Sequence, residues 1–258
     1  MPGDTLAQLL GGILQALNAV IIVMLVVKLA ANGVARTYWP VIGWLVLDAA
    51  ERVLQLRFYK FGVVLFQLGQ GLKLPFALLI LWQLCRFVFA QYPAIGSFAN
   101  RALRTVIPLC VILGLVSFLT DPAAADGRSE HLQLVIAVAR AATTAVLVFE
   151  LLLGAFAGWF PVGMKRNIAR LLIGLMVLYG IGWVNMLLAN GSSMNILWTN
   201  VVTALVGICV MTYWLVTLGR AGELESASVI PAWNPARLAH MTGQLEEIQA
   251  PLSRRGYQ

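Results

Sequence analysis

Residues 9–30 read LLGGILQALNAVIIVMLVVKLA and contain a single charged residue, Lys28, near their end. An α-helix rises about 1.5 Å per residue, so about 20 mainly apolar residues cross the hydrocarbon core of a bilayer. This stretch therefore predicts a membrane-spanning helix. The preceding residues lack the basic segment of a secretory signal, so we expect the helix to be retained rather than cleaved.

The composition extends this prediction to the whole chain. Of its 258 residues, 60% are hydrophobic and only 11% are charged, whereas soluble domains carry about 25% charged residues. So few charges cannot cover a water-facing surface, and most of the surface is expected to face lipid. The net charge of +7 is not clustered on one face, so no nucleic-acid partner is expected.

Six further apolar runs follow the first and predict a seven-helix transmembrane bundle. Turn-forming residues separate them, such as Asn32-Gly33 and Asp121-Pro122. The seven predicted spans are Leu9–Ala30, Tyr38–Leu56, Phe61–Ala90, Ala102–Leu119, Leu132–Ala157, Ile168–Asn190 and Ile196–Leu218. The fold class is thus all-α, with a bundle over residues 1–219 and a cytoplasmic tail over residues 220–258.

The distribution of Lys and Arg predicts the orientation, because cytoplasmic loops carry an excess of both. Twelve lie on one side of the predicted spans: Lys28, Arg36, Arg86, Arg101, Arg104, Lys165, Arg166, Arg170, Arg220, Arg237, Arg254 and Arg255. Three lie on the other side: Arg57, Lys60 and Arg128. The sequence therefore predicts an outside amino terminus and a cytoplasmic carboxyl terminus in a multi-pass protein of the cell (inner) membrane.

Several polar residues fall inside the predicted spans, where a charge costs roughly 2.5–3.5 kcal/mol at a helix centre. They lie at similar depths, because Glu51 precedes the outer turn at Tyr59 by as many residues as Gln67 follows it, and Asp48 pairs with Gln70 in the same way. Asn185 and Asn200 lie a turn below the outer surface on the last two spans. The candidate ligand-binding residues of this polar layer are Asp48, Glu51, Arg52, Gln70, Lys73 and Arg140.

Three interpretations of this layer remain open. Asp48 and Arg52 are four residues apart and can pair on one helix face, which leaves Lys73 or Arg140 as partner for Glu51. The layer is then a buried ion-pair network that orders the bundle, an outward-facing site for a ligand or ion, or a set of charges wetted at the interface. Gly69, Gly71 and Pro75 beside Lys73 also suggest a kinked or locally unwound third helix, as transporters use at substrate sites.

Two other features stand apart from the layer. Glu150 lies in the cytoplasmic third of the fifth span, where it either bonds another helix or relays protons, although no second relay member is visible. In the tail, Asn234-Pro235 can begin a helix whose apolar face carries Leu238, Met241, Leu245 and Ile248. This short amphipathic helix and the inner loops are the predicted contacts for a membrane or cytoplasmic protein partner.

The chain lacks the motifs of common catalytic and cofactor sites. It has two His and three Cys, no CxxC pair, no HExxH or GxSxG, and no Gly-rich phosphate loop. We therefore expect no catalytic residues, no metal site and no cofactor.

The stretch Leu81–Arg104, with Arg86-Phe87 and Tyr92-Pro93-Ala94, resembles a pattern in uncharacterised bacterial seven-helix membrane proteins, as does Tyr38-Trp39-Pro40. This resemblance covers about the first half of the chain and implies the topology alone. The topology is also similar to that of microbial rhodopsins, which carry the retinal lysine in the last helix. The last span here has no lysine, so retinal is not expected.

Together these features favour a non-enzymatic integral membrane module, sensor-like or an accessory subunit of a membrane complex. The alternative is a small-solute or ion transporter or channel that uses the outward-facing polar layer. Loss of solute flux in Asp48→Asn and Lys73→Met proteins would separate the second hypothesis from the first.

Overall fold

A computed structural model describes residues 2–58, 62–89, 97, 101, 104–105, 130–159, 164–188, 193–224, 226–227, 239–240, 243–244 and 246–247. Its elements within these residues are α1 (Pro2–Ala31), α2 (Trp39–Arg57), α3 (Gly62–Val88), α5 (Glu130–Trp159), β1 (Met164–Lys165), α6 (Arg166–Leu188), α7 (Ser193–Thr217), α8 (Ala221–Leu224) and β2 (Ser226–Ala227).

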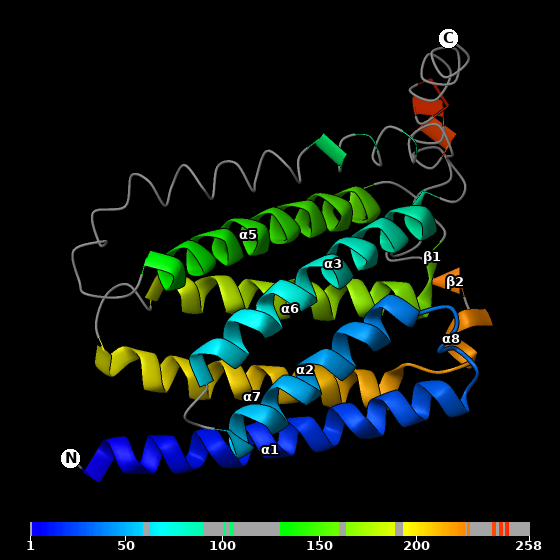
Figure 1. The fold of residues 1–258 in the computed structure, drawn as a ribbon. Helices are drawn as coiled ribbons and strands as arrows, with labels where there is room; N and C mark the ends of the chain where they lie inside the picture. The colour runs from blue at the N-terminus through cyan, green and yellow to red at the C-terminus, as the bar shows by residue number, and fades with distance from the viewer. Residues whose placement is uncertain are drawn as a thin grey trace.

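The long helices lie side by side, and those that follow one another run in opposite directions, except that α3 and α5 run in the same direction (Figure 1). Each described long helix packs against the next one described along the chain, and α7 packs against α1, so the order α1, α2, α3, α5, α6, α7 closes into a ring. The α1–α2 connection, β1 and α8 share one end of this bundle, and the amino terminus lies at the other (Figure 1). Short connections produce antiparallel neighbours such as α1–α2, α2–α3, α5–α6 and α6–α7.

The all-helical prediction is confirmed for the part of the chain that the structure describes, apart from one two-residue ribbon. Six of the seven predicted spans correspond to α1, α2, α3, α5, α6 and α7. The span predicted at Ala102–Leu119 falls outside the described residues. Three helices are long and apolar enough to cross a membrane, at Leu9–Ala31, Arg166–Asn185 and Trp198–Thr217, which supports a membrane protein.

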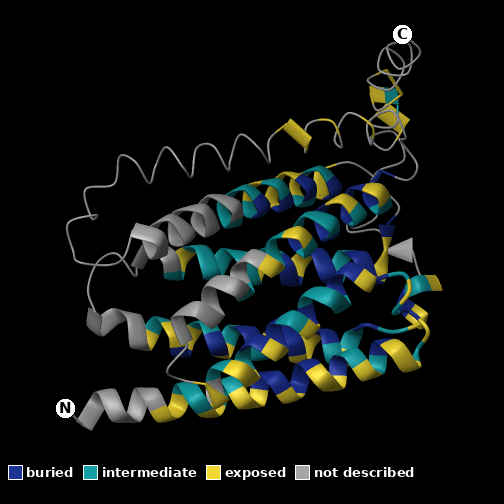
Figure 2. Cartoon of the chain, viewed as in Figure 1, coloured by how far each residue is buried: buried dark blue, intermediate teal, exposed yellow. Residues whose placement is uncertain are grey.

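The core is built from stripes of side chains spaced four, three and four residues apart, the spacing that keeps side chains on one helix face. On α1 the buried stripe is Asn18, Ile22, Leu25 and Leu29. The opposite face of α1 exposes large apolar side chains, including Val20, Val23 and Val27, and exposed and buried positions alternate around most helices (Figure 2). An exposed apolar exterior around a packed core suits a protein surrounded by lipid.

Two glycines allow large rings to enter the helix contacts. A Cβ atom at Gly43 of α2 would collide with the ring of Phe76 from α3, and one at Gly174 of α6 would collide with the indole of Trp214 from α7. Trp214 is fully buried, and its indole N–H donates a 3.1 Å hydrogen bond to the carbonyl of Arg170. Glycine at these positions is therefore required by close packing.

Of the two expectations for the third helix, a kink or a locally unwound turn, the unwound turn is wrong, and the kink stays a prediction. The helix α3 is continuous from Gly62 to Val88 with Pro75 inside it. Gly69 serves a different purpose, because a Cβ atom there would overlap the carboxylate of Glu51 from α2. The glycine marks a close approach of a charged side chain and not a break in the backbone.

The start of the tail is attached to the bundle by a short ribbon that the sequence did not predict. Strand β2 pairs antiparallel with β1, with Met164 opposite Ala227 and Lys165 opposite Ser226. The single turn of α8 precedes β2 and contacts α6 and β1. The amphipathic tail helix predicted after Asn234 lies largely outside the described residues.

Candidate functional site

Four of the predicted site residues form one ion-pair cluster between α2 and α3. The carboxylate of Asp48 accepts a hydrogen bond at 2.7 Å from Arg52, one turn along α2, and another at 2.5 Å from Lys73 of α3. The side chain of Asp48 is 7% exposed and that of Lys73 is 13% exposed. The cluster thus lies inside the helix packing rather than at the surface.

Lys73 joins the two acids of this cluster. Its ammonium lies 2.6 Å from the carboxylate of Glu51 as well as beside Asp48. Glu51 also accepts a hydrogen bond at 2.9 Å from Gln55, one turn further along α2, and Gly69 of α3 leaves the room that its carboxylate occupies. A single lysine therefore connects both acids of α2 to α3.

The cluster is balanced in charge, with two acids and two bases. Every one of its four ions has an opposite charge within 2.7 Å. Of the two partners proposed for Glu51, Lys73 and Arg140, this geometry shows Lys73 beside it. A balanced, directly paired cluster has no spare charge to attract a charged ligand, which favours the interpretation of an ordering network.

Two predicted site residues cannot be placed in this cluster. Gln70 belongs to α3 and Arg140 to α5, but their side chains lie outside the described part of the structure. Elsewhere in the predicted polar layer, the amide of Asn185 on α6 donates a 3.2 Å hydrogen bond to the side-chain oxygen of Asn200 on α7. The two asparagines at matching depth thus connect the last two helices.

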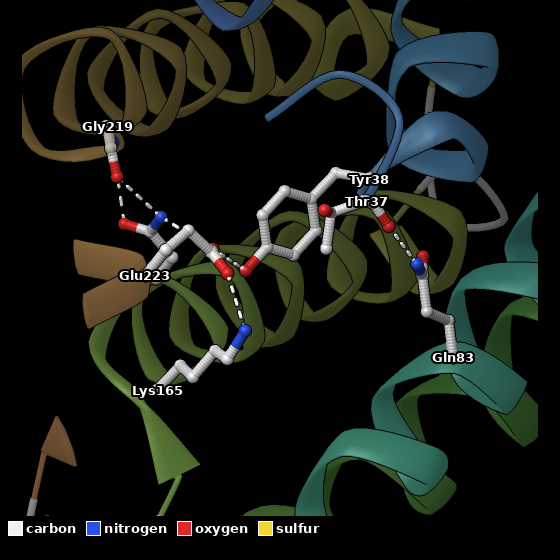
Figure 3. A network of polar contacts seen from close by, with 7 residues as sticks. Thr37, Tyr38, Gln83, Lys165, Gly219 and Glu223 are labelled. Carbon is white, nitrogen blue, oxygen red and sulfur yellow. Dashed lines mark hydrogen bonds and ion pairs between the residues drawn. The ribbon is translucent and has the colours of Figure 1, made fainter. Parts of the chain in front are cut away.

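A second polar network closes the end of the bundle at which α8 lies (Figure 3). The carboxylate of Glu223 on α8 accepts hydrogen bonds from the hydroxyl of Tyr38, from the Asn167 amide at 2.8 Å and from the Lys165 ammonium at 3.0 Å. These donors come from the residue before α2, the start of α6 and strand β1. We refer to Tyr38, Lys165, Asn167 and Glu223 as the tail clamp.

The tail clamp also stabilises the ionised form of Glu223. Burial alone would raise the pKa of this carboxyl, but the hydrogen bonds from Tyr38, Asn167 and Lys165, together with the charge of Lys165, outweigh burial and hold the pKa below its ordinary value. Asn167 adds a hydrogen bond at 2.8 Å to the carbonyl of Gly219. The first turn of the tail is therefore fastened both through a side chain and through its backbone.

Further side chains tie helix ends together near the clamp. Lys28 of α1 donates to the carbonyl of Leu215, and Arg170 of α6 donates to the carbonyl of Thr217. A cation at the carboxyl end of a helix satisfies carbonyls that have no partner within the helix. Both contacts meet the last turn of α7. Gln83 of α3 similarly donates to the backbone of Thr37 before α2 (Figure 3).

Sequence reasoning did not find the tail clamp. Tyr38 fits the interfacial aromatic belt, which hides its hydrogen-bonding role, and Glu223 lies in a segment predicted to be a simple tail. One signal was available, since Glu223 is an acid at the end where Lys and Arg accumulate. Its partner Lys165 is more than fifty residues away along the chain, so only the fold brings the two together.

No family model, no curated protein and no solved structure matches this chain.

Proposed function

We propose that the chain is a non-enzymatic integral membrane module, sensor-like or an accessory subunit, with its tail as the output. In this proposal it spans a bacterial inner membrane seven times, with the amino terminus outside and the tail in the cytoplasm. The opposite directions of α1 and α2, of α2 and α3, of α5 and α6, and of α6 and α7 support this topology, and the shared direction of α3 and α5 is the one expected if a further span separates them. So does the position of Lys28, Lys165 and Arg170 at one end of the bundle, together with α8 (Figure 1).

The tail clamp is the observation that carries the proposal. One carboxylate on the segment leaving the bundle contacts residues at the starts of α2 and α6, so a shift of either helix changes the contacts of the tail. An interaction that joins a terminal segment to two helices can transmit a helix movement to a partner bound by that segment. The proposed partner is a membrane or cytoplasmic protein that binds the tail and the inner loops.

Breaking the clamp should release the start of the tail without unfolding the bundle. We expect Glu223→Gln to increase amide hydrogen exchange in residues 219–227 severalfold, because the glutamine cannot pair with Lys165 as a carboxylate does. Hydrogen-exchange mass spectrometry of the full chain in lipid nanodiscs measures this. Glu246→Gln, an exposed acid further along the tail, is the matched control and should leave the exchange unchanged.

The clamp should also weaken at acid pH. Because the folded-state pKa of Glu223 lies below its ordinary value, the carboxylate contributes stability above the ordinary pKa of a glutamate, and this contribution is lost as the pH falls through the lowered value. We expect exchange in residues 219–227, corrected for its intrinsic pH dependence, to rise over that range in the parent protein. A flat profile in the parent, or the same rise in Glu223→Gln, would contradict this assignment.

Native mass spectrometry of the gently solubilised protein tests the partner proposal directly. We expect a stoichiometric second protein that is lost when residues 232–258 are deleted and weakened by Glu223→Gln. A lone chain in every preparation, or a partner that is retained after the deletion, would contradict the proposal. Thermal unfolding of the truncated protein controls for damage to the bundle.

The buried charges of the α2–α3 cluster favour a second candidate, a small-solute or ion transporter or channel. Charged residues inside membrane helices commonly line solute pathways. If this candidate is correct, Asp48→Asn and Lys73→Met abolish flux in proteoliposomes while the fold survives. If the two changes lower only the thermal stability, the cluster is structural.

A further inference from the structure

A buried carboxyl in the last third of α5 is not used by either network. Glu150 is 0% exposed and belongs to a stripe with Val146, Leu153 and Ala157, all of which are buried. Neither of its carboxyl oxygens has a hydrogen-bond partner in the described part of the structure. The stripe places this carboxyl in the core of the bundle, between apolar neighbours one turn away on either side.

A second buried polar group without a described partner lies near Glu150. The hydroxyl of Tyr179 on α6 is buried and forms no hydrogen bond to any described residue. Tyr179 interacts electrostatically with Glu150 and with Asp48 of the α2–α3 cluster. Its ring packs, together with Phe149, against the apolar cluster of Ala77, Leu81 and Val146. A carboxyl and a phenol, the one on α5 and the other on α6, thus share an otherwise apolar region.

This arrangement requires a compensating ligand. More than nine in ten buried polar groups in folded proteins are hydrogen-bonded, and an isolated carboxylate in an apolar region costs several kcal/mol, so such a group neutralises instead. No described cation pairs with Glu150. On the helices that pack against α5, Lys73 of α3 is held by two acids, Arg86 of α3 lies over Trp82, and Arg170 of α6 donates to Thr217.

A metal ion fits the surroundings of Glu150 less well than a proton. Sodium and divalent ions take several oxygen ligands, and no group of three His, Cys, Asp or Glu side chains able to hold a metal occurs among the described residues. A proton needs only the carboxyl itself. Once bound, it gives the carboxyl an O–H group that can donate a hydrogen bond to Tyr179, directly or through a buried water molecule.

We propose that Glu150 is a proton-binding site inside the helix bundle, with Tyr179 as its hydrogen-bonding partner. Binding converts the carboxylate and one proton from water into a carboxylic acid, and release returns the same proton to water. This assignment does not depend on the proposed function.

Infrared spectroscopy of the full chain in lipid vesicles tests the proposal, because only a protonated carboxyl gives the carbonyl stretching band of a carboxylic acid. With glutamate labelled with ¹³C at its side-chain carboxyl, we expect one such band at neutral pH. It should be lost in Glu150→Gln and should shift in Tyr179→Phe. Glu51→Gln, which alters an ion-paired acid, is the matched control and should leave the band in place.

Three results would overturn the proposal. The first is that no Glu150-dependent band appears at any pH at which the protein remains folded. The second is that the band is lost when Na⁺ is added at constant pH, which would show a cation site. The third is that the band is unchanged in Tyr179→Phe, which would rule out Tyr179 as the hydrogen-bonding partner. If Glu150→Gln fails to fold, Glu150→Asp replaces it. The aspartate is unlabelled, so the ¹³C-shifted band must then disappear.

Discussion

Replacing Lys73 with methionine should lower the free energy of unfolding by about 3–5 kcal/mol, the range observed when one partner of a buried ion pair is removed. Lys73 lies 2.5 Å from Asp48 and 2.6 Å from Glu51, so the variant leaves Glu51 with Gln55 alone. The remaining acids then repel each other inside the helix packing. Equilibrium unfolding of the purified full chain in mixed micelles measures the loss.

Two variants show whether burial causes this effect. Lys165→Met removes the lysine of a more exposed pair, whose side chain is 49% exposed, and should cost about 0–1 kcal/mol. The double variant Glu51→Gln/Lys73→Met should recover part of the stability, because it no longer contains the unpaired acid. A loss from Lys73→Met no larger than that from Lys165→Met would show that the cluster is wetted by solvent and does not order the bundle.

Replacing Gly174 with alanine should destabilise the contact between α6 and α7 by about 1–3 kcal/mol, the usual cost of adding a methyl group to a filled core. The new Cβ atom would overlap the indole of Trp214, a ring that is fully buried and held by its hydrogen bond to Arg170. The tryptophan cannot move without losing that bond. Unfolding in mixed micelles again provides the measurement.

The same helix offers a matched control. A Cβ atom at Gly180 or Gly182 would meet no atom within 4 Å, and alanine is favoured over glycine inside a helix by roughly 1 kcal/mol. We therefore expect Gly180→Ala to be neutral or stabilising while Gly174→Ala is destabilising. Adding Trp214→Phe to Gly174→Ala should restore part of the loss by making room for the methyl group. Equal effects at the two glycines would show that the α6–α7 contact is looser than described.

Hydropathy was sufficient to predict the long helices that the structure describes, because each corresponds to an apolar run that ends at turn-forming or charged residues, although only three of them are long and apolar enough to cross a membrane. The ribbon between β1 and β2 could not be predicted in this way, since each strand has two residues and no alternating pattern. The role of Gly69 was misjudged for a related reason. A glycine in a helix permits both a break and a close approach, and only the position of Glu51 on the neighbouring helix decides between them.

The candidate site was predicted where a local rule applied. The spacing of Asp48 and Arg52 fixes their pairing on one helix, whereas counting from the α2–α3 turn paired Asp48 with Gln70 and left Lys73 and Arg140 as alternative partners for Glu51. The tail clamp has no such rule, because Tyr38, Lys165 and Glu223 come from three distant segments. The same holds for the second polar group beside Glu150, since no spacing within α5 indicates that Tyr179 of α6 lies nearby.

The contact between α1 and α7 has a consequence for biogenesis. Helix α1 leaves the ribosome before α7, so it finds one of its principal neighbours only after α7 has been synthesised. Until then the buried stripe of α1 is not covered by α7. In the complete bundle Gly207 of α7 lies close to Asn18 of α1, because a Cβ atom added to Gly207 would be 3.2 Å from the Asn18 side-chain nitrogen. A nascent chain that stops before residue 193 therefore leaves the buried stripe of α1 without the face of α7 that covers it in the bundle.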